Sequence, residues 1–92
     1  MRISDKKKEK IIEQILALLY SSPNPLFTSQ IAAEIARDEE FVKELLLKLK
    51  KKGFVNEIKK NSEGVDYLKR IRWKLSDKIY SVYRQHQGNK FL

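Results

Sequence analysis

Residues 28–55, TSQIAAEIARDEEFVKELLLKLKKKGFV, constrain the fold of this chain more than any other segment. Apolar residues recur there at helical spacing, which predicts a short helix, a turn at Arg37 and Asp38, and a longer helix that ends near Gly53. Thr28 is a favoured N-cap residue for the short helix. The segment, over about residues 28–52, therefore predicts a helix–turn–helix.

The longer helix separates an apolar stripe from a charged face. Its inward stripe follows the i, i+3, i+4, i+7 spacing and consists of Val42, Leu45, Leu46 and Leu49. Asp38 is expected to cap its start, and Gly53 suits the left-handed position just beyond its end. The outward positions are then Glu39, Glu40, Lys43, Glu44, Leu47, Lys48 and Lys51.

The flanking segments supply another helix on each side and a hairpin. A first helix is predicted from Asp5 to Ser21, stopped by the prolines that follow. Its apolar stripe consists of Ile11, Ile12, Ile15, Leu16, Leu18 and Leu19. A strand from Phe54 to Lys60, a turn and a returning strand from Val65 to Leu75 predict a two-stranded wing over about 54–75. Ser76 should cap a last helix over about 77–87, with residues 88–90 as a frayed tail.

The returning strand alternates between two kinds of side chain. Tyr67, Ile71, Trp73 and Leu75 share one face, which is apolar, while the other face is mostly basic. Trp73 is therefore expected to lie in the core, and not to act as a platform on which bases stack. The predicted fold class is α+β and mostly α, in a single domain over residues 1–92.

Positive charge is concentrated in one segment. Residues 48–74 carry ten basic and three acidic side chains, a net charge of +7, while the whole chain carries +8. Clustered positive charge is typical of proteins that bind a polyanion, because neutralised phosphates release condensed counterions. The alternative is a basic surface that only keeps the protein in solution.

Composition argues against several other classes of protein. The chain has no cysteine and one histidine, so it predicts no disulfide, metal site or cofactor. It has no glycine-rich phosphate loop and no plausible catalytic grouping, so we expect that it is not an enzyme. Neither a signal peptide nor a membrane-spanning segment is predicted, which favours a cytoplasmic location, with association with the nucleoid as one possibility.

Two motifs together resemble the winged helix-turn-helix regulators of the multiple-antibiotic-resistance and phenolic-acid types. One is IAAEIARDEEFVKELLLKLKKKGFV, with its Lys52-Gly53-Phe54 step, and the other is WKLSDK at residues 73–78. The resemblance covers about residues 8–88. It implies that the longer helix of the helix–turn–helix enters the major groove and that the tip of the wing contacts the neighbouring backbone or the minor groove.

The resemblance and the charge together predict a transcriptional regulator that binds double-stranded DNA. The expected contacts are Lys43, Lys48, Lys51, Lys59, Lys60, Lys69, Arg70 and Arg72. A homodimer through the apolar stripes of the first and last helices is expected as well. The acidic residues and Leu47 on the outward helix face depart from the family pattern. They leave open a protein-binding role for that face, and binding of RNA or single strands through the wing is a third alternative.

Overall fold

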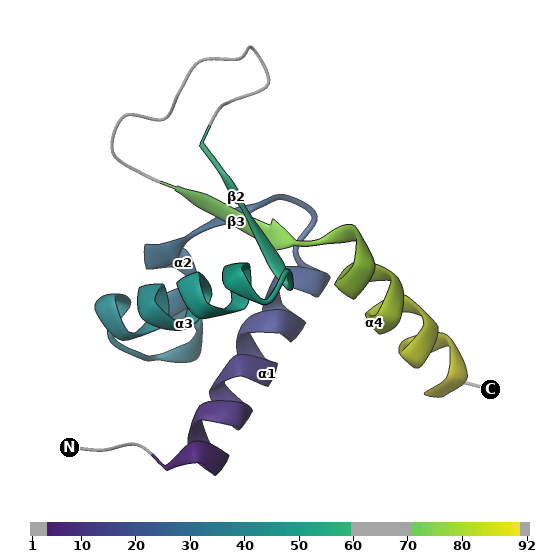
Figure 1. Ribbon diagram of the computed structural model, residues 1–92, viewed down its shortest axis with the longest axis horizontal. Helices are drawn as coiled ribbons and strands as arrows, with labels where there is room; N and C mark the ends of the chain where they lie inside the picture. Colours follow the sequence, from purple (N-terminus) through teal and green to yellow (C-terminus); the bar gives the residue numbers. More distant parts are fainter. Residues whose placement is uncertain (1–3, 60–70, 91–92) are drawn as a thin grey trace.

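The structure, a computed structural model, describes residues 4–59 and 71–90, with side chains up to residue 85. The described residues form four helices and three strands (Figure 1). In chain order these are α1 (Asp5–Ser21), β1 (Leu26–Phe27), α2 (Thr28–Ile35), α3 (Glu39–Lys51), β2 (Val55–Ile58), β3 (Arg72–Leu75) and α4 (Asp77–Lys90). The predicted winged-helix class, mostly helical with a small antiparallel sheet, is confirmed.

The core lies where α1, α2 and α3 meet the inner face of the sheet. Trp73 is its largest fully buried side chain, with 0% of its surface exposed, so the expected core position is confirmed. The α3 stripe predicted from the sequence is buried as well. The core consists of Ile11, Ile15, Leu16, Leu19, Ile31, Ala32, Val42, Leu45, Leu46, Leu49, Val55, Trp73 and Leu75.

The sheet has three strands in the order β1-β3-β2: the expected pair of antiparallel strands is present as β2 and β3, and the short strand β1, which was not expected, joins the other edge of β3. β3 lies in the centre, with Trp73 opposite Leu26 on one side and opposite Glu57 on the other. β1 is only two residues long, too short to show alternation, and it forms because a free edge of β3 offers unpaired backbone groups. The expected strands are also longer than the described β2 and β3, and residues 60–70 lie outside the described part.

Three of the four helices begin after a residue whose side chain caps the helix N-terminus. Ser4, Asp38 and Ser76 cap α1, α3 and α4, each accepting from the backbone N–H three residues later at 3.2–3.3 Å. The prediction for α2 is wrong, because Thr28 is the first helical residue and Phe27 precedes the helix. The backbone N–H of Phe27 instead donates to Oε1 of Gln30 at 2.8 Å.

Two residues with positive φ end the helices of the helix–turn–helix. Gly53 follows α3 with φ of 80°, as its sequence position predicts. Ala36 follows α2 with φ of 56°, a left-handed conformation that is costly for a residue with a Cβ atom. The turn thus comprises Ala36 to Asp38, one residue more than expected.

α4 leaves the body of the protein on the side away from α3 (Figure 1). It continues to Lys90, so the expected frayed tail at 88–90 is wrong. A single glycine costs a helix only about 1 kcal/mol and does not by itself end it. Along the described part of the chain, no helix is both long and apolar enough to cross a membrane.

Candidate nucleic-acid interface

The outward face of α3 is exposed at every position predicted from the sequence. The helical repeat of 3.6 residues places one stripe directly opposite the buried one. It consists of Glu40, Glu44, Leu47 and Lys51, in that order along the helix. Leu47 keeps 40% of its surface exposed, so an apolar side chain lies in the middle of this charged stripe. The first two turns of this stripe are therefore acidic, and its positive charge begins only in the last turn.

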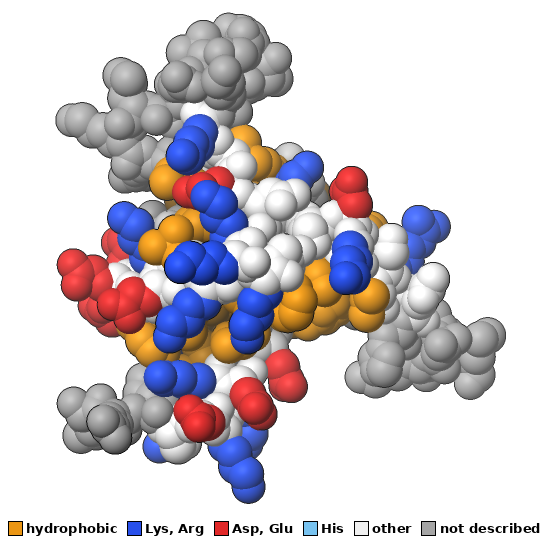
Figure 2. Space-filling view, in the orientation of Figure 1, with side chains coloured by type: hydrophobic (Ala, Val, Ile, Leu, Met, Phe, Trp, Pro, Cys, Tyr) orange, Lys and Arg blue, Asp and Glu red, His pale blue; other side chains and the backbone are white. Residues whose placement is uncertain are grey.

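Basic side chains gather at the C-terminal end of α3. The last turn contains Lys48, Lys50 and Lys51, and Lys52 is the C-cap residue. Cations are favoured there by the partial negative charge of the helix end, just as Glu39 and Glu40 are favoured at its start. Figure 2 shows the result as a band of lysine and arginine side chains over α3, with acidic side chains at one end.

Glu57 joins the end of α3 to the foot of the wing. Its side chain is only 9% exposed and accepts a hydrogen bond from Nζ of Lys50. Nζ of Lys59 lies 4.0 Å from the same carboxylate oxygen, at the limit of an ion pair. Lys50 is thus engaged within the protein, while the side chain of Lys59 remains 64% exposed. Sequence reasoning did not single out Glu57, because its partner on α3 is defined only by the fold.

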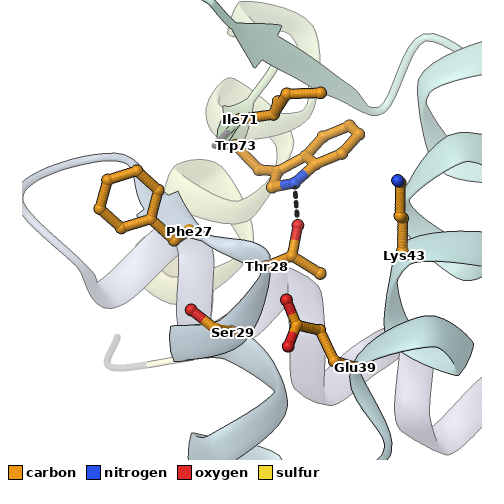
Figure 3. Close-up of a pocket in the computed structure, with 7 residues that line it drawn as sticks. All are labelled: Phe27, Thr28, Ser29, Glu39, Lys43, Ile71 and Trp73. Atoms are coloured by element: carbon orange, nitrogen blue, oxygen red, sulfur yellow. Dashed lines mark hydrogen bonds between the residues drawn. The ribbon is translucent and has the colours of Figure 1, made fainter. Parts of the chain in front are cut away.

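A pocket of about 210 Å³ lies between the start of α2, the start of α3 and β3. Figure 3 shows Lys43 and Glu39 at its α3 side, Thr28 and Ser29 at its α2 side, and Trp73 above them. The indole Nε1–H of Trp73 donates to Oγ1 of Thr28 at 2.8 Å. Lys43, expected to contact DNA, therefore lines a pocket on the flank of α3 that it shares with Glu39.

Arg72 packs against the sheet. Its guanidinium carbon lies 4.7 Å from the centre of the Phe27 ring, a cation–π geometry. Phe27 and Arg72 face each other across β1 and β3, so their side chains share the outer face of the sheet. Arg72 is half-buried in this stack, whereas the sequence predicted a side chain that extends from the wing to contact DNA phosphates. The role of Phe27 was missed because β1 itself was not foreseen.

The structure places the other expected contacts as follows. Lys43, Lys48, Lys51 and Lys59 are all exposed. Lys48, Lys51 and Lys59 lie at the end of α3 and the foot of the wing. Lys60, Lys69 and Arg70 lie outside the described residues. Within residues 4–59 and 71–90, no group of three potential metal ligands comes together.

A second surface lies on the other side of the molecule, where α4 meets α1. The ring of Tyr20 lies 5.1 Å from that of Tyr80 and 5.6 Å from that of Tyr83. Burial, and then the negative charge of Glu13, raise the pKa of Tyr83 above its ordinary value. Tyr80 and Val82 remain 47% and 53% exposed. In contrast, Ile11, Ile15, Leu16 and Leu19 of the α1 stripe are buried in the core and Ile12 and Leu18 are partly buried, so little of this stripe remains accessible. The dimer surface expected from the first and last helices stays a prediction.

Comparison with solved structures identifies the fold as a winged helix. A single-site mutant of Lactococcus lactis ZitR is similar with a TM-score of 0.68 and 20% identity over 96% of this chain and 56% of its own. The S. aureus MepR–DNA complex gives 0.67 and 21%, over 91% of this chain and 69% of that one. Streptococcus pneumoniae FabT in complex with DNA gives 0.66 and 17%, over 88% and 52%.

The chain thus spans little more than half the length of ZitR and FabT. No protein-family model matches this chain, and neither does any curated protein sequence. At such identities the likeness establishes the shared winged-helix fold, which is also the fold of multiple-antibiotic-resistance-type regulators.

Proposed function

We propose that this chain is a single winged-helix domain that binds duplex DNA as a transcription regulator. The observation that carries the proposal is the exposed basic surface at the end of α3 and the foot of the wing, on a fold shared with MepR and FabT. Both of those proteins have been solved in complex with DNA. A protein with this partner would work in the cytoplasm, in association with the nucleoid, and as a regulator it would need no catalytic centre.

Phosphate contacts supply most of the affinity in this proposal. On α3 they come from Lys43, Lys48 and Lys51, and on the wing from Lys59 together with Lys60, Lys69 and Arg70. Arg72 supports the foot of the wing through its stack on Phe27 and contributes its charge to the same face. Each phosphate neutralised adds about −0.9 to the slope of log affinity against log salt concentration.

The test is fluorescence anisotropy of a labelled mixed-sequence duplex, titrated with the protein from low to moderate salt. If five to eight of the basic residues contact phosphates, the slope should be about −4.5 to −7. Absence of binding at low salt would contradict the proposal, and the net charge of +8 would then serve mainly to keep the protein in solution. Competition with single strands and structured RNA separates the proposal from the third alternative.

Matched charge reversals locate the surface. Lys48→Glu with Lys51→Glu should reduce affinity at low salt by at least tenfold, since two phosphate contacts are lost and two repulsions are added. Lys6→Glu with Lys10→Glu, on the exposed start of α1, changes the net charge equally and should have a much smaller effect. Equal losses in both variants would mean that only overall charge matters. These positions avoid Arg72, whose replacement would disturb the sheet.

We also propose that the protein acts as a homodimer, since paired half-sites require paired recognition helices. With much of the α1 stripe buried, the exposed apolar side chains of α4, Tyr80 and Val82, are the proposed contact. Sedimentation at micromolar concentration tests this. A strict monomer, or a dimer unaffected by Val82→Asp, would refute this interface.

A protein partner for α3 is a second candidate function, supported by the exposed Leu47, which follows Glu40 and Glu44 on the outward stripe. A basic, partly apolar protein surface would complement this stripe. In that case Leu47→Asp or Glu40→Lys should abolish partner binding, and duplex DNA should bind weakly. If Lys48→Glu with Lys51→Glu is the damaging change instead, DNA is the partner.

A further inference from the structure

We infer that duplex DNA lies against the C-terminal end of α3 and the foot of the wing, and that the first two turns of α3 stay outside the major groove. The protein then recognises the DNA backbone and has little preference for base sequence. This inference rests on the proposed function, and it adds a binding mode and a class of target, duplex DNA irrespective of sequence.

The charge along α3 changes sign between its two ends. Residues 38–44 contain four acidic side chains and one lysine, whereas residues 48–52 contain four lysines and no acidic side chain. Glu40 and Glu44 near the start of α3 and Lys51 near its end share the exposed stripe opposite the buried one, so a partner that covered this whole stripe would meet both signs of charge. A recognition helix that inserted its N-terminal residues into the groove would bring the acidic set toward phosphates.

The two ends are too far apart to neutralise each other. Glu40 and Lys51 are eleven positions apart on the outward stripe, or about 16 Å along a helix that rises about 1.5 Å per residue. The Debye length is about 8 Å at physiological ionic strength. A phosphate near Glu40 therefore experiences mainly repulsion, and a phosphate near Lys51 mainly attraction.

Lys43, the one lysine in the acidic half of α3, does not make the charge of that half positive. Lys43 leans over the pocket between α2 and α3, beside Glu39, and so lies on the flank of the helix (Figure 3). Glu40 and Glu44 occupy the outermost stripe instead, and their carboxylates accept no hydrogen bond from another described side chain. Carboxylates in the groove could accept from cytosine N4, but two of them one turn apart also face phosphates on either side.

The basic half is continuous with the wing. Glu57 holds Lys50 at the end of α3 and lies 4.0 Å from Lys59, so the end of the helix and the foot of β2 form one surface. Among the described residues of this basic half, the lysines that remain for the DNA are Lys48, Lys51, Lys52 and Lys59. Their ammonium groups are point charges that bind phosphates without distinguishing bases.

The experiment removes the two outermost carboxylates with Glu40→Gln and Glu44→Gln in one variant. Anisotropy with a mixed-sequence duplex should show affinity about two- to fivefold higher than wild type at low salt, because a repulsion near the backbone is removed. Glu9→Gln with Glu13→Gln, on exposed positions of α1, adds the same net charge and should change the affinity less. Circular dichroism verifies that both variants are folded.

Selection from a pool of duplexes with randomised sequence provides the second arm. The wild-type chain should enrich no motif, with the best sequences bound no more than about tenfold tighter than the average; specific regulators commonly discriminate by about 10³ or more. Enrichment of a motif with strong discrimination, or weaker binding by the Glu40→Gln, Glu44→Gln variant, would show that this end of α3 enters the groove, and would overturn the inference while leaving DNA binding intact. Absence of any duplex binding by the wild type would instead overturn the proposed function.

Discussion

Removal of the Thr28 hydroxyl, which accepts a hydrogen bond from Trp73, should lower the free energy of unfolding by about the cost of leaving one buried donor without a partner. Thr28→Val keeps the shape of the side chain but leaves Nε1–H of a fully buried Trp73 without its partner at 2.8 Å. An unsatisfied buried donor costs about 1–3 kcal/mol. Because Thr28 and Trp73 also line the pocket of about 210 Å³, water can replace part of this bond. We therefore expect a loss of about 1–2 kcal/mol in the free energy of unfolding.

The protein carries its own probe, because Trp73 is its single tryptophan. Denaturant unfolding followed by tryptophan fluorescence gives the free energy of unfolding, and thermal melting should show a midpoint about 5–15 °C lower for a domain of this size. Thr28→Ser retains the hydroxyl and should cost less than about 1 kcal/mol. A Thr28→Val variant as stable as Thr28→Ser would refute the reasoning.

A second background isolates the hydrogen bond from other effects of the substitution. Trp73→Phe removes the donor and costs stability of its own, because it leaves space in the core. In that background Thr28→Val should cost almost nothing, since no donor remains to be left unsatisfied. Circular dichroism replaces fluorescence for these variants. An unchanged cost in the Trp73→Phe background would show that the hydroxyl acts elsewhere.

Three further predictions concern the wing, the helix end and the tyrosine cluster. Glu57→Gln releases Lys50 and Lys59, so affinity for duplex DNA in the anisotropy assay should rise by about two- to fourfold at low salt. A fall in affinity would show that the position Glu57 gives to the wing matters more than the charge of the released lysines. Gly53→Ala should lower the free energy of unfolding by about 1 kcal/mol in denaturant unfolding. The cost comes from backbone strain at φ of 80° alone, because no atom beyond the two adjacent residues lies within 4 Å of the added Cβ; a neutral result would contradict this. Because the pKa of Tyr83 is raised in the folded state above 10.0, the unfolded state loses the proton first, and stability should fall as pH rises beyond about 10. Tyr83→Phe should remove that part of the decline in stability profiles and Glu13→Gln should reduce it, whereas profiles parallel to wild type would exclude a contribution from this tyrosine.

Local signals predicted the helices with little error. The bounds of α1 and the caps Asp38 and Ser76 agree with expectation, because each cap bonds to a backbone group three residues away. Gly53 ends α3 as predicted for the same reason. Thr28 was misassigned as a cap because its hydroxyl accepts from a residue 45 positions away.

In the candidate interface, too, the sequence predicts some features and only the fold decides others. The exposed face of α3 follows from its helical spacing, and so does the change of charge along it. Which lysines are engaged within the protein does not follow, since Lys50 meets Glu57 only when β2 folds back beside α3. Arg72 likewise has its place fixed by Phe27, on a strand too short to recognise.

Information within single segments of the chain was enough to define the helices, their inward stripes, the buried tryptophan and the position of the positive charge. These depend on periodicity and on hydrogen bonds between near neighbours, which one segment contains. The third strand, the bond between Trp73 and Thr28, and the pairing of Glu57 arise only in the folded protein. Each of these needs two segments to meet, and the energy of such a contact exists only after the chain has closed around its core.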